Sequence, residues 1–187
     1  MTRRTARMVV TSVMSGLAAL SLLSGCAAPL GSVIEADALA ARLRDASRDS
    51  LLVVDVRKAA EYEAGHVAGA VYADAEKWKE TSLADSSGLD HEELWRERIG
   101  EFGISGRIPV VLYDDGRMTE AARVWFILQH FGVPEVAVLN GGYPALEPLI
   151  AAGQVSISQE AATAAPATFR PRKHKGGSIG LVEKACV

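Results

Sequence analysis

The sequence has few cysteines and no excess of basic residues, and both shortages exclude classes of protein. Two thiols in 187 residues are too few for a disulfide-stabilised scaffold or a four-thiolate zinc site. A net charge of −3 excludes a general electrostatic nucleic-acid binder, which needs a basic face. The four histidines are scattered without the spacing of metal ligands, so we expect neither a metal nor another cofactor. A chain of this length supports one domain with tails.

Charged residues are also absent from a long stretch near the amino terminus. Arg3, Arg4 and Arg7 come first, and no charged residue follows between Met8 and Ile34. A basic start followed by an apolar stretch and then small residues is typical of an export signal. We therefore expect residues 1–25 to be a signal peptide and the rest of the chain to lie outside the cytoplasm.

The end of this signal contains a possible lipidation site. Leu23-Ser24-Gly25-Cys26 resembles the bacterial lipobox, which implies cleavage before Cys26 and acylation of this cysteine. Two or more acyl chains give stable membrane anchoring, whereas one gives only marginal binding. The resemblance thus implies a bacterial lipoprotein of the cell envelope, with residues 26–32 as a tether to the membrane. An uncleaved transmembrane anchor and a plain secretory signal are the alternatives.

Residues 33–155 alternate between short apolar runs and helical patterns. The runs predicted as strands are 51–56, 69–72, 108–113 and 136–139. The spacing of apolar residues predicts helices at 35–46, 91–102, 120–131 and 145–152. Strands that alternate with helices predict an α/β domain with a parallel sheet covered on both faces. Residues 76–89 show no clear pattern and include a predicted loop, and the composition after Gly153 indicates a linker.

The loop after Tyr113 is the predicted ligand site. In open parallel sheets ligands bind at the carboxyl ends of the strands. Residues 114–119 leave the strongest predicted strand and lead into a helix, whose first N–H groups and dipole favour an anion. A cysteine at this strand end would be held as a thiolate, but this chain has Asp114 there.

Four stretches of this domain resemble the rhodanese family of sulfurtransferases. They are Asp55-Val56-Arg57 with residues 61–70, Val110–Tyr113, residues 121–125 and residues 138–143. The resemblance covers residues 33–155 and implies a three-layer α/β/α rhodanese-like domain with a central parallel sheet. It also implies sulfur transfer from a small anionic donor, thiosulfate or 3-mercaptopyruvate.

The resemblance assigns a special role to the first residue of the loop. Active members carry a nucleophilic cysteine there, which holds the transferred sulfur as a persulfide. Tandem members have two such domains, and their amino-terminal domain usually carries Asp instead. Tyr113-Asp114-Asp115-Gly116 resembles that non-catalytic domain, so no residue of this chain is predicted to be catalytic. A carboxylate cannot form a persulfide, and we interpret Asp114 as an anion that satisfies the loop N–H groups. The loop consists of Asp114, Asp115, Gly116, Arg117, Met118 and Thr119.

Other positions of the family motifs are expected to be structural. These positions are Asp55, Arg57, Gly65, His66, Gly69, Arg123, Gly141 and Gly142. Asp55 and Arg57 should orient one another, and His66 should hydrogen-bond within its turn. The two adjacent glycines should allow a tight strand-to-helix turn.

The carboxy-terminal residues 156–187 are interpreted as a linker and a basic tail. Residues 26–169 have a net charge of −10, whereas the tail contains the candidate anion-binding residues Arg170, Arg172, Lys173 and Lys175. The tail resembles the connector of tandem members, and residues 181–186 resemble the opening helix of a second domain, which implies a chain truncated before its catalytic half. A second, catalytic rhodanese domain is then the partner. A solvated tail near anionic headgroups is the alternative.

Two further hypotheses remain open for the whole chain. One is a lipid-anchored binding or scaffold domain that uses the loop at residues 114–119 to hold a partner or an anion. The other is an active enzyme that uses Cys186, which stands apart from any strand-loop-helix context. By its residues, the chain alone is predicted to be inactive.

Overall fold

The centre of the molecule is a strand whose four residues are all buried, β5 (Val110–Tyr113). Runs of Val and Leu are typical of strands covered on both faces, and this strand lies in the middle of a five-stranded sheet in the order β1-β6-β5-β2-β4. Its neighbours pair with it in parallel, and so do the outer strands with theirs. The other strands are β1 (Val33–Ile34), β6 (Val136–Leu139), β2 (Leu52–Asp55) and β4 (Val71–Tyr72).

The computed structural model describes residues 29–45 and 50–170. The expected signal peptide and several residues singled out above, Cys26, Arg172, Lys173, Lys175 and Cys186, lie outside the described residues. Within the described ranges, no helix has the length and apolarity needed to cross a bilayer.

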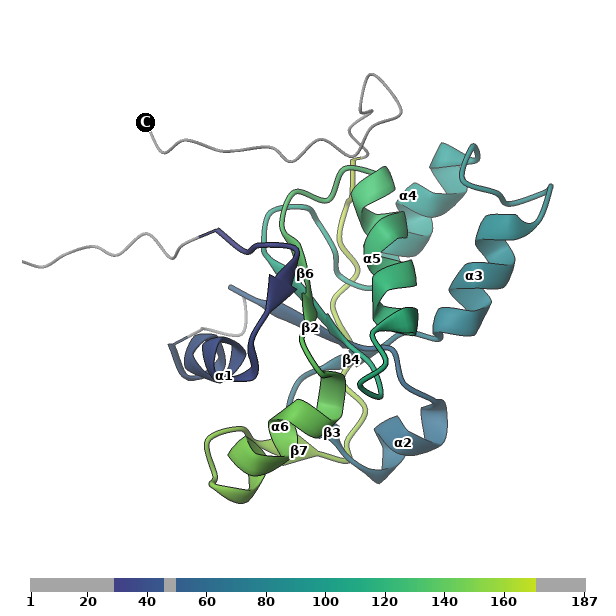
Figure 1. Cartoon of the computed structure of the whole chain (residues 1–187). Coiled ribbons are helices and arrows are strands. Elements are labelled where there is room, and N and C mark those ends of the chain that lie inside the picture. The colour runs from purple at the N-terminus through teal and green to yellow at the C-terminus, as the bar shows by residue number, and fades with distance from the viewer. Residues whose placement is uncertain (1–28, 46–49, 171–187) are drawn as a thin grey trace, which may run out of the picture.

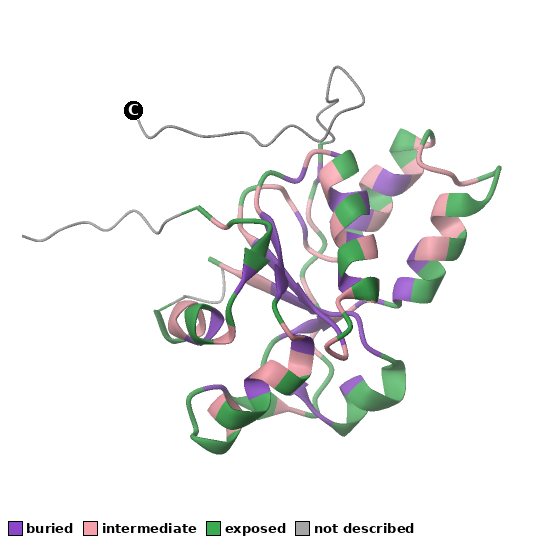
Figure 2. Ribbon diagram, viewed as in Figure 1, coloured by how far each residue is buried: buried purple, intermediate pink, exposed green. Residues whose placement is uncertain are grey.

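Helices cover both faces of the sheet (Figure 1). One face packs against α3 (Ala75–Leu83), α4 (Glu92–Glu101) and α5 (Thr119–His130), and the other against α1 (Ala36–Asp45) and α6 (Gly142–Ala151). Successive strand residues point to opposite faces, so Val110 and Leu112 belong to the first core and Val111 and Tyr113 to the second. Figure 2 shows the buried residues concentrated in the strands and on the inner faces of the helices. The predicted α/β class with a central parallel sheet is confirmed.

Two helices were not predicted from the sequence. The short helix α2 (Ala59–Ala64) follows β2, and α3 occupies part of the patternless stretch 76–89. Asp74 caps α3 by accepting a hydrogen bond from the backbone N–H of Lys77 at 3.0 Å. Trp78, which is buried, packs edge to face on Trp95 of α4 with ring centroids 5.6 Å apart. One cap and one buried tryptophan therefore hold a helix that carries few other apolar residues.

Residues 153–170, here called the strap, pack along the domain instead of leaving it as the predicted linker. Within the strap, β7 (Ile157–Ser158) pairs antiparallel with β3 (His66–Val67), and Ala162 bridges to Val71 at the sheet edge. Further on, the N–H of Ala167 donates to the carbonyl of Gly100 at 2.8 Å, and Phe169 is buried in the first core. The packed structure thus extends past the predicted boundary at residue 155. Composition missed this because small residues can pack as closely as large ones.

The Phe169 ring gives the strap a testable energetic role. Phe169→Ala should lower the free energy of unfolding by about 3–5 kcal/mol, because it leaves a cavity in the core. Phe126→Ala on α5 is the matched control, since Phe126 is 44% exposed and Phe169 only 2%. Urea denaturation of both variants measures the difference, and equal losses would show that the strap is not part of the folded core.

Candidate functional site

The loop between β5 and α5 is built around the buried carboxylate of Asp114. Its Oδ1 accepts hydrogen bonds from the N–H groups of Gly116 at 3.0 Å and Met118 at 3.1 Å. Its Oδ2 accepts from the N–H of Ala121, in the first turn of α5, at 3.3 Å. Asp114 is 1% exposed, and its carboxylate lies at the helix amino terminus, where negative charge is favourable. The carboxylate of Asp114 thus satisfies three backbone N–H groups of the loop and of the first turn of α5.

The loop backbone is tightly constrained by its neighbours. Met118 has a φ of 58°, in the left-handed region that non-glycine residues rarely adopt. The N–H of Tyr143 donates to the carbonyl of Asp114 at 2.8 Å, which ties the loop to the turn that opens α6. At Gly142, with a φ of 57°, an added Cβ would lie 2.4 Å from the Gly116 nitrogen and 2.5 Å from the Asp114 oxygen. Only a glycine lets the two turns approach so closely.

A second buried carboxylate, Asp55, lies at the end of the adjacent strand β2. Asp55 is 0% exposed and pairs with Arg57, whose Nη2 lies 2.6 Å from Oδ2 and whose backbone N–H donates to Oδ1 at 2.9 Å. The hydroxyl of Tyr113 also donates to Oδ2, at 2.7 Å. The same hydroxyl accepts from the N–H of Val67 at 3.2 Å, and Arg57 Nη2 donates to the carbonyl of Gly65 at 2.8 Å. The network therefore joins β2 and β5 to Gly65 and β3.

Electrostatics keep this network in one protonation state. Burial raises the pKa of Tyr113 far above its ordinary value, and the negative charge of Asp55 raises it further. Burial alone would lower the pKa of Arg57, but the hydrogen bond and the charge of Asp55 outweigh that effect and leave it raised. Tyr113 thus stays a hydroxyl donor and Arg57 stays a cation at any pH near neutrality.

Tyr143 connects the network to the loop. Its ring lies against the guanidinium of Arg57, 3.9 Å from Cζ to the ring centroid, while its backbone N–H holds Asp114. Asp55, Arg57 and Asp114 were predicted from the sequence, but no role was predicted for the side chains of Tyr113 and Tyr143. Tyr113 ends an otherwise aliphatic buried strand, and its hydroxyl group there was the feature of the sequence that could have indicated a hydrogen-bonding role.

The outer side of the loop is open to solvent. Arg117 pairs with Asp115 at 2.7 Å, with 73% of the Arg117 side chain exposed. This hydrogen-bonded pairing lowers the pKa of Asp115. Thr119 is also exposed. The Arg117 side chain is therefore engaged with its neighbour at the surface and does not reach Asp114.

The remaining predicted positions lie in three different places. His66 is buried, and its ring contacts the backbone carbonyls of Tyr62, in α2, and Glu160, in the strap. Gly69 has a φ of 84° in the turn before β4, and Arg123 pairs with Glu120 on α5. Arg170 follows Phe169, which contacts Gly106 before β5, whereas Asp114 comes after β5. The structure thus places Arg170 at the opposite end of the sheet from the loop.

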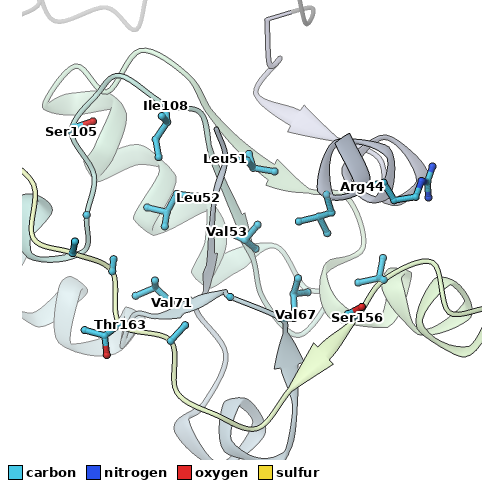
Figure 3. A pocket seen from close by; sticks show the side chains of 18 of the residues that line it. Arg44, Leu51, Leu52, Val53, Val67, Val71, Ser105, Ile108, Ser156 and Thr163 are labelled. Carbon is cyan, nitrogen blue, oxygen red and sulfur yellow. The ribbon is translucent and has the colours of Figure 1, made fainter. Parts of the chain in front are cut away.

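A cavity of about 1000 Å³ lies at that opposite end, between the strap and the start of β2. Apolar side chains, including Leu52, Val67 and Ile108, surround it, and the Arg44 guanidinium is directed away from it (Figure 3). None of the described residues that line it is Asp, Glu, His or Cys. Within residues 29–45 and 50–170, moreover, no group of three such side chains is arranged to hold a metal ion.

Comparison with known families identifies a rhodanese-like domain at residues 35–147. Since this match spans more than half of the chain, the protein belongs to the rhodanese-like domain family. Sulfurtransferases are among the relatives of this chain.

Two curated relatives are sulfurtransferases. The chain is 33% identical over 88 residues to 3-mercaptopyruvate sulfurtransferase of Escherichia coli K12. This alignment covers 47% of the chain and 31% of the relative. It is 36% identical over 104 residues to thiosulfate sulfurtransferase of Cricetulus griseus, and this alignment covers 54% of the chain and 34% of the relative. The matched region thus spans about a third of the length of these relatives.

Solved structures show the same fold. The 3-mercaptopyruvate sulfotransferase of Escherichia coli superimposes with a TM-score of 0.60 at 24% identity, over 77% of this chain and 56% of that one. The 3-mercaptopyruvate sulfurtransferase of Leishmania major superimposes with a TM-score of 0.53 at 22% identity, over 76% of this chain and 39% of that one. The predicted three-layer rhodanese-like fold is therefore confirmed.

The buried pair predicts a large effect of removing one charge. Asp55→Asn should lower the free energy of unfolding by about 3–5 kcal/mol, because Arg57 would remain buried without a counter-charge. Asp115→Asn removes an equivalent charge from the exposed pair with Arg117 and should change stability little. Thermal or urea unfolding compares the two, and similar losses would contradict a structural role for the buried pair.

The contact between the two turns predicts a steric effect at Gly142. Gly142→Ala should destabilise the protein and shift the backbone amide resonances of residues 114–118, because its Cβ would overlap the loop backbone. Gly153→Ala is the control, since Gly153 has a similar φ of 69° but no atom within 4 Å of an added Cβ. The control should lower the free energy of unfolding by only about 1–2 kcal/mol, the cost of a left-handed backbone for alanine, and should leave the resonances of residues 114–118 unchanged. Equal effects would show that the two turns do not depend on close contact.

Proposed function

We propose that this chain is a non-catalytic rhodanese domain that acts beside a cysteine-bearing rhodanese domain in sulfur transfer. The observation that carries the proposal is the buried carboxylate of Asp114, which stands where active family members have their nucleophile. It already accepts the hydrogen bonds of Gly116, Met118 and Ala121, the N–H groups that would otherwise face an anion in the loop.

The chemistry of sulfur transfer supports this assignment. A cysteine thiolate attacks the outer sulfur of thiosulfate, forms an S–S bond and releases sulfite as the S–S bond of the donor breaks. The resulting persulfide then passes its terminal sulfur to an acceptor such as cyanide, which becomes thiocyanate, and the thiolate is regenerated. Asp114 has no sulfur with which to form the persulfide, and its carboxylate is a poor nucleophile toward sulfur.

The donor and the partner follow from the relatives. The curated proteins similar to this chain transfer sulfur from thiosulfate or 3-mercaptopyruvate, as their names state. Both donors are small anions, which the proposed catalytic partner domain would bind. Arg170 and the basic residues that follow it in the sequence are proposed to assist in binding the donor.

The proposed location rests on the sequence alone. Cys26 would carry the acyl chains that hold the domain at a membrane of the bacterial cell envelope, facing away from the cytoplasm. The acidic domain would then lie near the bilayer, and its basic tail would contact either the anionic headgroups or the partner domain.

Sulfur-transfer assays on the full chain test the proposal. With thiosulfate or 3-mercaptopyruvate as donor and cyanide as acceptor, the unmodified protein should show no turnover and no added sulfur by intact mass. Asp114→Cys should gain one sulfur atom, because the loop N–H groups would then face a thiolate. Asp114→Ser is the matched control, since it has the same shape without the thiol, and should gain none.

Two results would contradict the proposal. Turnover by the unmodified protein that is lost in Cys186→Ser would make the tail cysteine the active group. Absence of added sulfur in a folded Asp114→Cys variant would show that the loop no longer supports the family chemistry.

A further inference from the structure

The cavity between the strap and β2 lies where β4 is shorter than β2. Strand β4 pairs with Val54 and Asp55, and the described pairing does not reach Leu52 and Val53, the first two residues of β2. The strap crosses this place without filling it, and a volume of about 1000 Å³ remains open. Pockets that hold small molecules have volumes of about 300–1000 Å³, so the cavity is large enough for a ligand.

Aliphatic side chains form the walls of the cavity. Leu52, Val53 and Val67 surround one space in Figure 3, and Val155 and Ala162 line it from the strap. Phe, Tyr and Trp are absent from the described residues that line it. A nucleotide or an aromatic cofactor would therefore have no ring to stack on. An alkyl chain needs no such partner, because any aliphatic wall removes its surface from water.

The charged side chains at the cavity are positive. Arg44 and Arg107 are the two charged side chains among the described lining residues, and both are exposed. Within residues 29–45 and 50–170, neither forms an ion pair. The Arg44 guanidinium points away from the aliphatic walls, so its charge lies at the edge of the cavity and not between them (Figure 3). Because residues 26–169 have a net charge of −10, an edge with two arginines and no acid favours an anion locally.

We propose that this cavity binds a free fatty acid, with the alkyl chain between β2 and the strap and the carboxylate in solvent at the edge, beside Arg107. The chain leaves water, and the carboxylate keeps its hydration and meets a guanidinium, whose planar N–H groups match its two oxygens. A charge carried deep between the walls would be costly, since the lining residues that the structure describes provide no buried counter-charge. This inference does not depend on the proposed function, because the cavity lies at the opposite end of the sheet from the loop.

The bound alkyl chain would contact the sheet and the strap at the same time. The strap is fastened at two places near the cavity: the Ser156 carbonyl accepts from the N–H of Ala68 at 2.9 Å, and the N–H of Ala167 donates to the Gly100 carbonyl at 2.8 Å. Contacts between the ligand and the strap form only while the strap is docked, so the ligand stabilises the docked state. The fatty acid would therefore hold the strap more firmly against the domain.

Titration of the full chain with laurate at neutral pH, below the concentration at which laurate forms micelles, tests the site. The backbone amide resonances of β2 and of residues 153–156 and 162–165 should shift, and laurate should raise the protection of the strap against hydrogen exchange. The affinity should fall roughly fourfold for each CH₂ group removed, from laurate to decanoate to octanoate, as expected for the burial of methylenes. Unshifted resonances at these residues, or equal affinities for the three acids, would overturn the proposal.

The charge of the ligand head separates the proposed site from non-specific adsorption. Dodecyltrimethylammonium carries an alkyl chain of the same kind under a positive head, and adsorption to an acidic domain would favour it over laurate. The arginines at the edge predict the opposite preference. Lauroyl lysophosphatidylglycerol presents the same chain on a lipid headgroup and distinguishes a membrane lipid from a free fatty acid. Tighter binding of either compound than of laurate at the cavity would contradict the assignment to a free fatty acid.

Arg107 is the side chain that should meet the carboxylate. Arg107→Gln should weaken laurate binding by about threefold to fivefold, as expected for one exposed ion pair. Arg117→Gln is the matched control, because it removes the same charge from the opposite end of the sheet, and it should leave the affinity for laurate unchanged. Equal effects of the two substitutions would show that the carboxylate does not lie beside Arg107.

Leu52→Trp tests the cavity itself, because the larger side chain would occupy part of it. Laurate binding should weaken on the order of tenfold, which corresponds to about two methylenes that are no longer buried. Leu83→Trp on α3 is the matched control, since Leu83 is 73% exposed and does not line the cavity. Both variants keep residues 1–25, so any binding of laurate to that apolar stretch is the same in both. Unchanged affinity in a folded Leu52→Trp variant would overturn the proposal, and if this variant does not fold, the resonance shifts of the unmodified chain decide.

Discussion

The carboxylate of Asp55 binds together the parts of the molecule on which the candidate site rests. It receives the guanidinium and the backbone N–H of Arg57, and it receives the hydroxyl of Tyr113 from the neighbouring strand. Through these two partners it fixes Gly65 and β3, and through the stacking of Tyr143 on Arg57 it reaches the turn that opens α6. A buried charge is tolerated only where such partners surround it, so the network imposes one geometry on the carboxyl ends of β2 and β5.

Two buried carboxylates thus lie at the carboxyl ends of the adjacent strands β2 and β5 but have different partners. Asp55 is neutralised by a cation, whereas Asp114 is satisfied by the N–H groups of the loop and the first turn of α5. The second arrangement is an anion site filled by the protein's own side chain. The loop N–H groups are thus satisfied although the loop contains no thiol.

The strap is the clearest case in which sequence patterns fell short. Ala162 and Phe169 pack against elements more than 60 residues earlier in the chain, and no local period signals such contacts. Helix α3 was missed for a similar reason, because Trp78 is held by Trp95 rather than by an apolar stripe on its own helix. By contrast, the buried strands β2, β5 and β6 and the helix α5 were predicted, since their apolar residues recur at short and regular spacing.

The sequence by itself determined the α/β class, the loop at Asp114 and the partnership of Asp55 with Arg57, because each depends on residues close together in the chain. Only the tertiary structure decided that Tyr113 and Tyr143 join this pair, that Gly142 must have no side chain, and that Arg170 lies away from the loop. It alone placed the Glu160 carbonyl against His66, 94 residues earlier in the chain. The physical reason is that a polar group's partner is set by which backbone atoms folding brings within hydrogen-bond distance, and residue spacing does not encode that distance.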